Sequence, residues 1–325
     1  MTTPVPQLEG VDFRMFRGAA DYQDFARIIT AAAHGEGEDR VETGEAIASA
    51  YDHLERCDPA RDLLVAEVDG LPVAYSRVFW DDEEDGRIYK LVCFVDPAHG
   101  GRGIGTALLA WNEARLREIA ADHDVSTKLV QAFVADANEA ATALVRGAGY
   151  QPGTYMAQMV RPTVDDLPDH PLPDGLEIRP VREEDVRTIW EADVEAFRDH
   201  WGFVEQTDED FARFVGWPYH DPTLWKIAWD DEGVAGQVKS FINTAENEAS
   251  GQKRGWTEAI STSRRWRRRG VAKALIVESI RELAARGMTE VALGVHTENP
   301  NGAYQLYESL GYEVVHTWTT YRKPL

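Results

Sequence analysis

Hydrophobic and polar positions follow the same order twice along the chain. In residues 13–32 a short apolar stretch is followed by an arginine, a polar turn and apolar positions at helical spacing, and residues 178–196 repeat this order. Apolar residues that recur every three or four positions predict an amphipathic helix, whereas short apolar runs bounded by turn signals predict strands. We therefore expect each half to begin with a strand followed by one or two helices.

The repetition continues to the end of each half, where a strand enters a glycine-containing loop, a helix follows, and a further strand and helix lead to terminal strands. The offset between the halves is 167 residues from Gly103 to Gly270 and 162 residues from Gly149 to Gly311. Because the offset changes so little, two copies of one domain are the economical interpretation. The matched segments are 95–120 with 262–287, and 138–150 with 299–312.

Turn signals divide the middle of each half into strands. Asp-Gly pairs at 69–70 and 85–86 separate apolar stretches within residues 63–95, which is typical of a hairpin, and residues 224–262 show a similar pattern. We therefore expect an α+β fold in which each half is a mixed, mostly antiparallel sheet flanked by helices.

A proline-rich segment separates the halves. Residues 161–175 contain four prolines among acidic residues, a composition that disfavours helix and strand and is typical of a linker. The length of 325 residues suits two domains of roughly 150 residues each. The predicted division is an N-terminal domain over 1–160, a linker over 161–175 and a C-terminal domain over 176–325.

Composition and charge narrow the classes of function. Hydrophobic residues make up 43% of the chain, which is enough for packed cores and argues against wholesale disorder. The net charge of −22 argues against a nucleic-acid partner, because a binding surface must neutralise phosphates with lysine and arginine. The charge suits a cationic acceptor, but a generally acidic proteome would explain it equally well.

The cysteine content and the hydropathy pattern predict a cytoplasmic protein without a membrane partner. We expect a monomer or a homodimer. Cys57 and Cys93 are too few for a secreted disulfide framework, and no apolar run approaches the length of a membrane helix. The amino terminus lacks the pattern of a signal peptide. The nine histidines are dispersed, so we expect no metal site.

The strongest chemical signal is an arginine-rich loop. Residues 264–269 contain five arginines, Gly270 follows, and helix-forming sequence begins at once. A loop that opens a helix presents unpaired backbone N–H groups at the positive end of the helix dipole, which suits a phosphate or pyrophosphate. The spacing matches neither a Rossmann fingerprint nor a P-loop. A solvated, purely structural run of arginines is the alternative at this point.

The pattern R-x-x-G-x-A, from Arg267 through Gly270 to Ala272, resembles the pyrophosphate-binding motif of the GNAT N-acetyltransferase superfamily. The resemblance covers essentially the whole chain, twice, and the tandem arrangement is similar to that of mycothiol synthase and related two-domain acetyltransferases. It implies acetyl-CoA as cosubstrate, with the loop holding the pyrophosphate of coenzyme A. The second-half residues given this role are Arg267, Arg268, Arg269, Gly270, Val271 and Ala272.

The strand before this loop matches the family's catalytic strand. The backbone of Ile260, Ser261 and Thr262 corresponds to the backbone that pairs with the pantetheine arm and polarises the thioester carbonyl. Glu258 points to the same face as Ile260 and matches an acidic position that some members use, often through water, as the general base. An exposed strand glutamate is the alternative.

Two further positions follow from the resemblance. Tyr307 matches the tyrosine that protonates the leaving thiolate, whereas Tyr304, one helical turn earlier, is assigned to packing. Asn299 matches the asparagine that contacts the coenzyme, although it precedes Tyr307 by one residue more than is usual, and Asn301 is an alternative.

The first half departs from this pattern. Gly100 stands where an arginine or glutamine is expected, Leu91 replaces the glutamate, and Val145 replaces the tyrosine. Valine cannot donate a proton and leucine cannot accept one, so we expect a domain that binds coenzyme A without catalysing. Glycines retained for packing alone are the competing explanation. The corresponding cofactor residues are Val95, Gly101, Arg102, Gly103, Ile104, Gly105 and Asn138.

The resemblance implies that the C-terminal domain transfers an acetyl group from acetyl-CoA directly to a primary amine of a small molecule or peptide. No constellation for a covalent enzyme intermediate is apparent in the sequence. A hypothesis from another class is a non-catalytic acyl-CoA sensor or interaction module; the pair Glu258 and Tyr307 argues against it.

The acceptor is left open by the sequence. In this family the early helices and the hairpin form the acceptor cleft, which implies residues 197–211, 216–220 and 240–248. Asp199, His200 and Trp201 are candidate lining residues, with ordinary packing and capping as the alternative. A mycothiol precursor, an aminoglycoside-like compound, a polyamine and a peptide amino terminus all remain candidates.

Overall fold

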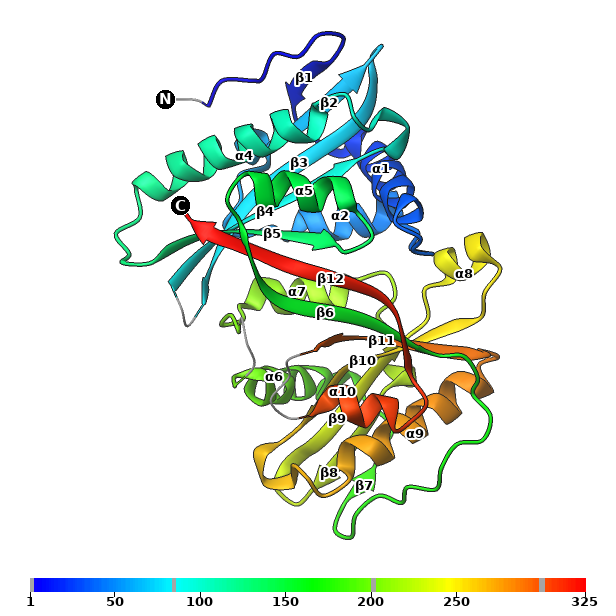
Figure 1. Cartoon of the computed structure of the whole chain (residues 1–325). Helices are drawn as coiled ribbons and strands as arrows, with labels where there is room; N and C mark the ends of the chain where they lie inside the picture. The colour runs from blue at the N-terminus through cyan, green and yellow to red at the C-terminus, as the bar shows by residue number, and fades with distance from the viewer. Residues whose placement is uncertain (1–2, 84–85, 200–202, 298–301) are drawn as a thin grey trace. The chain divides into compact units, whose positions relative to one another are not determined.

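The chain forms two compact units, one made of Met1–Tyr155 with Thr317–Leu325 and the other of Met156–His316 (Figure 1). The structure is a computed structural model that describes residues 3–83, 86–199, 203–297 and 302–325. Each unit contains a sheet with helices packed against it. The expected α+β class is confirmed.

The sheet of the first unit has the order β1-β2-β3-β4-β5-β12. Neighbouring strands are antiparallel except β4 and β5, which are parallel. Its strands and helices are β1 (Asp12–Met15), α1 (Tyr22–Gly35), α2 (Gly44–Asp52), α3 (Pro59–Asp62), β2 (Leu63–Val68), β3 (Leu71–Glu83), β4 (Gly86–Val95), α4 (Ile104–Ala121), β5 (Lys128–Ala135), α5 (Glu139–Gly147) and β12 (Glu313–Pro324).

The second unit repeats this plan with the order β6-β11-β10-β9-β8-β7, in which only β10 and β11 are parallel. Its elements are β6 (Gln151–Arg161), β7 (Glu177–Ile178), α6 (Val186–Phe197), α7 (Asp208–Gly216), β8 (Lys226–Asp230), β9 (Gly233–Phe241), α8 (Thr244–Ser250), β10 (Arg254–Thr262), α9 (Val271–Ala285), β11 (Glu290–His296) and α10 (Ala303–Glu308). Short 3₁₀ helices occur at η1 (Gly18–Asp21), η2 (Pro97–His99), η3 (Glu183–Asp185), η4 (Pro222–Leu224) and η5 (Arg264–Trp266).

The last strand of each sequence repeat completes the sheet of the other unit. Residues 156–161 of β6 pair antiparallel with β11, and residues 318–324 of β12 pair antiparallel with β5. The compact units therefore differ at this point from the predicted division at 160, because the segment 317–325 belongs to the first unit.

The segment predicted as a linker contains no helix or strand between residues 162 and 176. It is nevertheless attached to the second unit, because the partly buried side chains of Val164, Leu167 and Leu172 pack against that unit's core. The apolar side chains of this segment are thereby partly removed from water, whereas in a solvated linker they would remain exposed.

Helix α9 packs closely on the sheet of the second unit. Gly236 and Gly255 lie beneath it, and a Cβ added at either position would come within 2.7 Å of a side chain of α9. Val271 and Leu283 fill this space and are fully or almost fully buried. The small strand residues therefore fix how closely the helix that follows the arginine-rich loop approaches the sheet.

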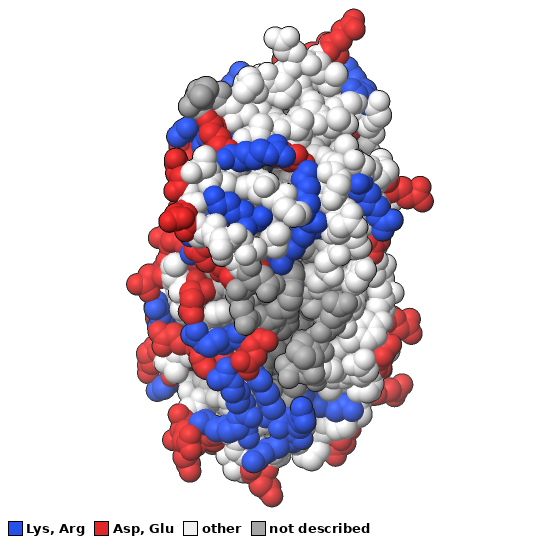
Figure 2. Space-filling view, turned by 60° about the vertical axis from the view of Figure 1, so that its left-hand side comes forward, with Lys and Arg blue, Asp and Glu red and all other residues white. Residues whose placement is uncertain are grey.

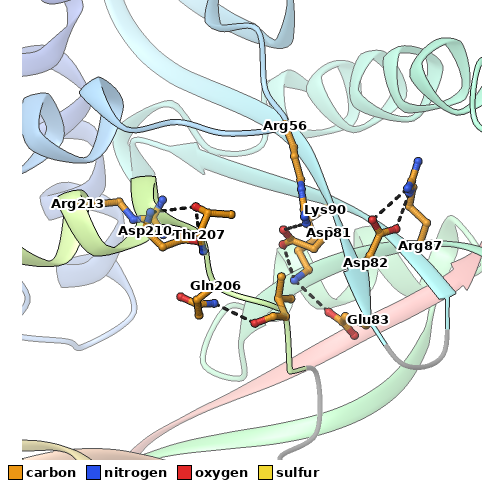
Figure 3. Close-up of polar contacts among 11 residues, drawn as sticks. Arg56, Asp81, Asp82, Glu83, Arg87, Lys90, Gln206, Thr207, Asp210 and Arg213 are labelled. Atoms are coloured by element: carbon orange, nitrogen blue, oxygen red, sulfur yellow. Dashed lines mark hydrogen bonds and ion pairs between the residues drawn. The ribbon is translucent and has the colours of Figure 1, made fainter. Parts of the chain in front are cut away.

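Figure 3 shows local side-chain contacts at the start of α7 and near the tip of the hairpin formed by β3 and β4. At the start of α7, the Thr207 hydroxyl accepts from the Asp210 N–H at 3.1 Å, and the Asp210 carboxylate accepts from the Thr207 N–H at 2.9 Å, which forms a capping box. In the first unit, Asp81 near the hairpin tip forms ion pairs with Arg56 at 3.1 Å and Lys90 at 2.9 Å. These acidic residues are paired at the surface.

Among the described residues, no helix is both long and apolar enough to cross a membrane.

Candidate active site

Strands β10 and β11 pair only at their beginning. Their parallel pairing ends at Trp256 opposite Ala292, although β10 continues to Thr262 and β11 to His296. Beyond Trp256, the edge of β10 that faces β11 therefore has no ladder partner among the described residues. Backbone groups at such an edge are available to a bound molecule.

A β-bulge changes the direction of β10 at the same place. The register with β9 shifts by one residue between Glu258 and Ser261, and Ala259 adopts a φ of 46°, which is costly for a residue with a side chain. In the first unit, the pairing of β3 with β4 continues without a shift past Leu91, which corresponds to Glu258. The strained bulge is therefore a feature of the second unit that the first unit lacks.

Glu258 is a partly buried carboxylate at this bulge. Its Oε1 accepts the backbone N–H of Gly294 on β11 at 2.7 Å. Burial raises its pKa to about 7, against the opposing effect of hydrogen bonds from the backbone N–H groups of Gly294 and Ala259. No lysine or arginine of the described residues forms an ion pair with it. A carboxyl group of this kind can exchange a proton near neutral pH.

Tyr307 lies on α10 and is within the electrostatic range of Glu258. Only 6% of Tyr307 is exposed, and burial followed by the nearby charge of Glu258 raises its pKa well above the ordinary value. Its ring lies 6.0 Å from that of Tyr312, whose hydroxyl is hydrogen bonded to the Thr257 hydroxyl at 2.8 Å. The structure thus brings together the two residues that the sequence nominates for proton transfer. Tyr304 is packed against the same core, as expected.

The arginine-rich loop ends in a helix N-terminus without a side-chain cap. Arg268 has a φ of 61° and Gly270 a φ of 86°, after which α9 begins at Val271. A Cβ at Gly270 would meet no atom within 4 Å, so the loop leaves open space there. Uncapped N–H groups beside open space fit an anionic group such as a pyrophosphate.

The corresponding loop of the first unit has the same backbone but different surroundings. Gly101 has a φ of 72° and Gly103 a φ of 81°, and α4 begins at Ile104, again without a side-chain cap. Here, however, a Cβ at Gly103 would lie 3.7 Å from the side chain of Leu8, and Arg102 donates to the carbonyl of Gly10 at 3.2 Å. The amino-terminal segment therefore lies against this loop.

Three of the five arginines are bound to neighbouring acidic residues. Arg264 donates to both carboxylate oxygens of Asp199, at 2.8 and 3.0 Å, and Arg267 donates to the same carboxylate at 3.2 Å. Arg265 pairs with Asp230 of β8 at 2.6 Å. In the space-filling view, basic side chains gather in clusters that acidic side chains border (Figure 2). The alternative of a structural arginine run thus accounts for part of this cluster.

Arg268 and Arg269 form no ion pair within the described part of the chain. The guanidinium of Arg269 lies 4.9 Å from the ring of Trp266, which is a cation–π distance. These two arginines therefore retain charge for a bound anion.

Asp199 was a candidate for the acceptor cleft, but its carboxylate is used by Arg264 and Arg267. The sequence carries no local signal for this role, because Arg264 and Arg267 are 65 and 68 residues away. The other acceptor-cleft candidates, His200 and Trp201, lie outside the described residues, and so do the candidates for a coenzyme contact, Asn299 and Asn301.

In the first unit, apolar side chains occupy the positions that correspond to the two candidate catalytic residues. Leu91 and Val145 are 8% and 5% exposed and belong to one hydrophobic cluster. Asn138 caps α5, accepting from Ala141 at 2.9 Å, and donates to Glu36 at 2.6 Å. Both ends of its side-chain amide are thus engaged within the unit, and its contact with coenzyme A stays a prediction.

Within the described ranges, no group of three or more His, Cys, Asp or Glu residues could hold a metal ion.

Comparisons with known proteins agree with this geometry. Residues 29–150 and 186–312 each match the Acetyltransferase (GNAT) family. A mycothiol acetyltransferase from Thermobispora bispora is 31% identical over 260 residues, which cover 78% of this chain and 80% of the relative. One from Salinispora arenicola is 28% identical over 257 residues, 78% of each chain.

Solved structures show the same tandem architecture. A GCN5-related N-acetyltransferase from Sphaerobacter thermophilus has a TM-score of 0.73 and 27% identity, covering 98% of this chain and 97% of the other. A tandem GNAT protein from the clavulanic acid biosynthesis pathway, at 17% identity, shares the fold with a TM-score of 0.65 over 97% of this chain and 98% of its own. The chain belongs to the GNAT acetyltransferase family and is an N-acetyltransferase with two tandem GNAT domains.

Proposed function

We propose that the second unit transfers an acetyl group from acetyl-CoA to a primary amine, with Glu258 as general base and Tyr307 as general acid. The observation that best supports this is the partly buried Glu258 carboxylate, which has backbone hydrogen bonds but no cationic partner among the described residues and lies where β10 and β11 separate. An incoming ammonium group would supply the missing charge partner.

Proton transfer follows from the two pKa values. With a pKa of about 7, Glu258 is largely ionised at slightly alkaline pH and can take the proton of the attacking amine, directly or through water. Tyr307 has a pKa above its ordinary value and is therefore protonated at the same pH, so it can donate to the leaving thiolate. The two residues start in the protonation states that the reaction needs.

Acetyl-CoA supplies the activated acetyl thioester. The uncapped N–H groups of Val271 and Ala272, together with Arg268 and Arg269, bind its pyrophosphate in this proposal. The unpaired edge of β10 at Ile260 to Thr262 offers backbone groups to the pantetheine arm. GNAT acetyltransferases use this cosubstrate, and the residues present fit it.

Transfer is direct, without an acyl-enzyme intermediate. The two thiols are poor nucleophiles, because burial raises the pKa of Cys57 and of Cys93 to about 12. Proximity of the bound reactants can lower the barrier by about 7 kcal/mol or more.

The first unit binds coenzyme A without catalysing in this proposal. The shared backbone of Gly101 and Gly103 supports binding, and the apolar packing of Leu91 and Val145 supports the absence of catalysis. The acceptor is a small molecule with a primary amine, and the similarity to mycothiol acetyltransferases supports a mycothiol precursor as the first compound to test.

The test measures release of the free thiol of coenzyme A from acetyl-CoA, with desacetylmycothiol, polyamines, aminoglycosides and short peptides as acceptors. We expect acceptor-dependent release that collapses in Tyr307→Phe while acetyl-CoA binding by calorimetry is preserved. Tyr304→Phe, one turn away on the same helix, is the matched control. Binding without any release by the wild-type protein would favour the sensor function instead.

A further inference from the structure

Four aromatic side chains form a continuous row that ends beside Glu258. Trp256 precedes Glu258 by two residues on β10 and so lies on the same face of the sheet. Phe241 is its register partner on β9, and the two rings are parallel within 1° at 5.7 Å. Trp217 contacts Phe241 edge-on at 4.6 Å, and Tyr219 contacts Trp217 at 5.2 Å. We call these four residues the aromatic row.

The aromatic row does not belong to the core of the second unit. None of its four side chains is a member of either hydrophobic cluster formed by the described residues of that unit, and all four are only partly buried. A cross-strand aromatic pair alone would be ordinary sheet packing. Large rings that are partly exposed and outside the core instead provide a surface on which a ligand can stack.

The neighbouring positions explain why this part of the face is available. Helix α6 covers the face nearer the loop, where Gln237 donates to the carbonyl of Ile189 at 3.2 Å and Lys239 pairs with Asp193 at 2.6 Å. At the next position on this face of β9, Phe241 contacts Trp217 from the loop after α7. Trp217, Tyr219 and Phe241 come from two of the segments that the sequence predicts for the acceptor.

We propose that the aromatic row binds an uncharged ring of the acceptor, attached close to the amine that reaches Glu258. The inference depends on the proposed function of that site. Two residues along a strand span about 7 Å, which half the width of a ring over Trp256, a linker of one or two bonds and a hydrogen bond from the amine to Glu258 together fill. Lys239, directly opposite Glu258 in register, already neutralises Asp193 at 2.6 Å, so that carboxylate is not available to a second positive charge on the acceptor.

The experiment compares four primary amines with the full-length protein and acetyl-CoA: benzylamine, cyclohexylmethylamine, the linear n-hexylamine, and cadaverine with its second ammonium. We expect kcat/KM to be highest for the two ring-bearing amines and lowest for cadaverine. In Trp256→Leu, kcat/KM for benzylamine should fall about tenfold, the upper range for one aromatic contact, while n-hexylamine and the KM for acetyl-CoA stay unchanged. Trp229→Leu, on β8 and outside the row, is the matched control.

A second readout separates this proposal from the proposed function. Calorimetry in the presence of coenzyme A measures binding of benzylamine and n-hexylamine without turnover. Tighter, Trp256-dependent binding of benzylamine supports the ring site even if no amine is acetylated. Equal affinity for the two amines in the wild-type protein, or equal losses for both in Trp256→Leu, would overturn the ring site, whether or not acetyl transfer is observed.

Discussion

Gly294 donates its backbone N–H to Oε1 of Glu258 over 2.7 Å, at the point where β10 and β11 cease to pair. A Cβ at position 294 would lie 3.4 Å from that oxygen, which is close to ordinary van der Waals contact. The hydrogen bond favours the ionised form and burial favours the neutral form. Burial has the larger effect, since the pKa rises to about 7.

The pH dependence of catalysis should report this balance. Because Glu258 must be ionised to accept a proton, kcat/KM should increase as pH rises through about 7 and level off above it. The profile would be measured from initial rates with one amine acceptor between roughly pH 5.5 and 9, a range that brackets this pKa. Glu258→Gln should lower the plateau by about 100-fold or more and remove the inflection. An unchanged inflection in this variant would assign it to another group.

The same shift predicts how stability changes with pH. A carboxyl group whose folded-state pKa lies above its unfolded value favours the folded state in its protonated form, so the wild-type protein loses stability as pH rises from about 4.5 to about 7. Glu258→Gln removes this loss. Its free energy of unfolding in urea should exceed that of the wild-type protein by up to about 3 kcal/mol above pH 7, with the difference absent below pH 4.5. A constant difference across this range would contradict the assignment.

Asp199 should modulate cofactor affinity through the arginines that it holds. Asp199→Asn removes a negative charge that Arg264 and Arg267 share, so the affinity for acetyl-CoA should increase roughly two- to fivefold at low salt, the size of an exposed ion pair. Calorimetry at two salt concentrations would detect the change and its screening. Asp208→Asn, which breaks the exposed ion pair with Arg187 in the same unit, should leave the affinity unchanged.

The two helix N-termini should bind coenzyme A independently. Alanine at Gly270 must adopt a φ near 86°, which is unfavourable by about 1–2 kcal/mol, so Gly270→Ala should weaken the site that supports turnover about tenfold. Gly103→Ala should weaken a second site without affecting the rate. Calorimetric stoichiometry near two per chain in the wild-type protein is the expected result. A stoichiometry of one, lost only in Gly270→Ala, would mean that the first-unit glycines serve packing alone.

Much of the site was accessible from the sequence because its motifs are local. Spacing alone placed Gly270 before a helix, whereas Glu258 and Tyr307 were nominated by the resemblance to GNAT acetyltransferases. The φ of 46° at Ala259 has no such signal, since alanine rarely adopts it and only the surrounding sheet imposes it. Asn138 did have a sequence signal for its structural role, because an asparagine just before a helical pattern favours a helix cap.

Long-range relationships were not accessible. The pairing of Asp199 with Arg264 joins residues 65 positions apart. The aromatic row likewise unites Trp217, Phe241 and Trp256 from three separate segments. Periodicity assigns each side chain to a face of its own element but does not state which elements meet.

The exchange of terminal strands has a consequence for the order in which the chain is made. β5 is translated before its partner β12, because β12 follows the second unit in the sequence. The edge of the first unit's sheet at β5 therefore stays unpaired until the later half of the chain has been translated. An exposed sheet edge is prone to pairing with other chains. Side chains of β12 also attach it to the first unit, because Lys323 donates to Glu113 at 2.6 Å and Arg322 donates to Gln131 at 2.7 Å. Translation of β12 thus completes the sheet of the unit that was begun first.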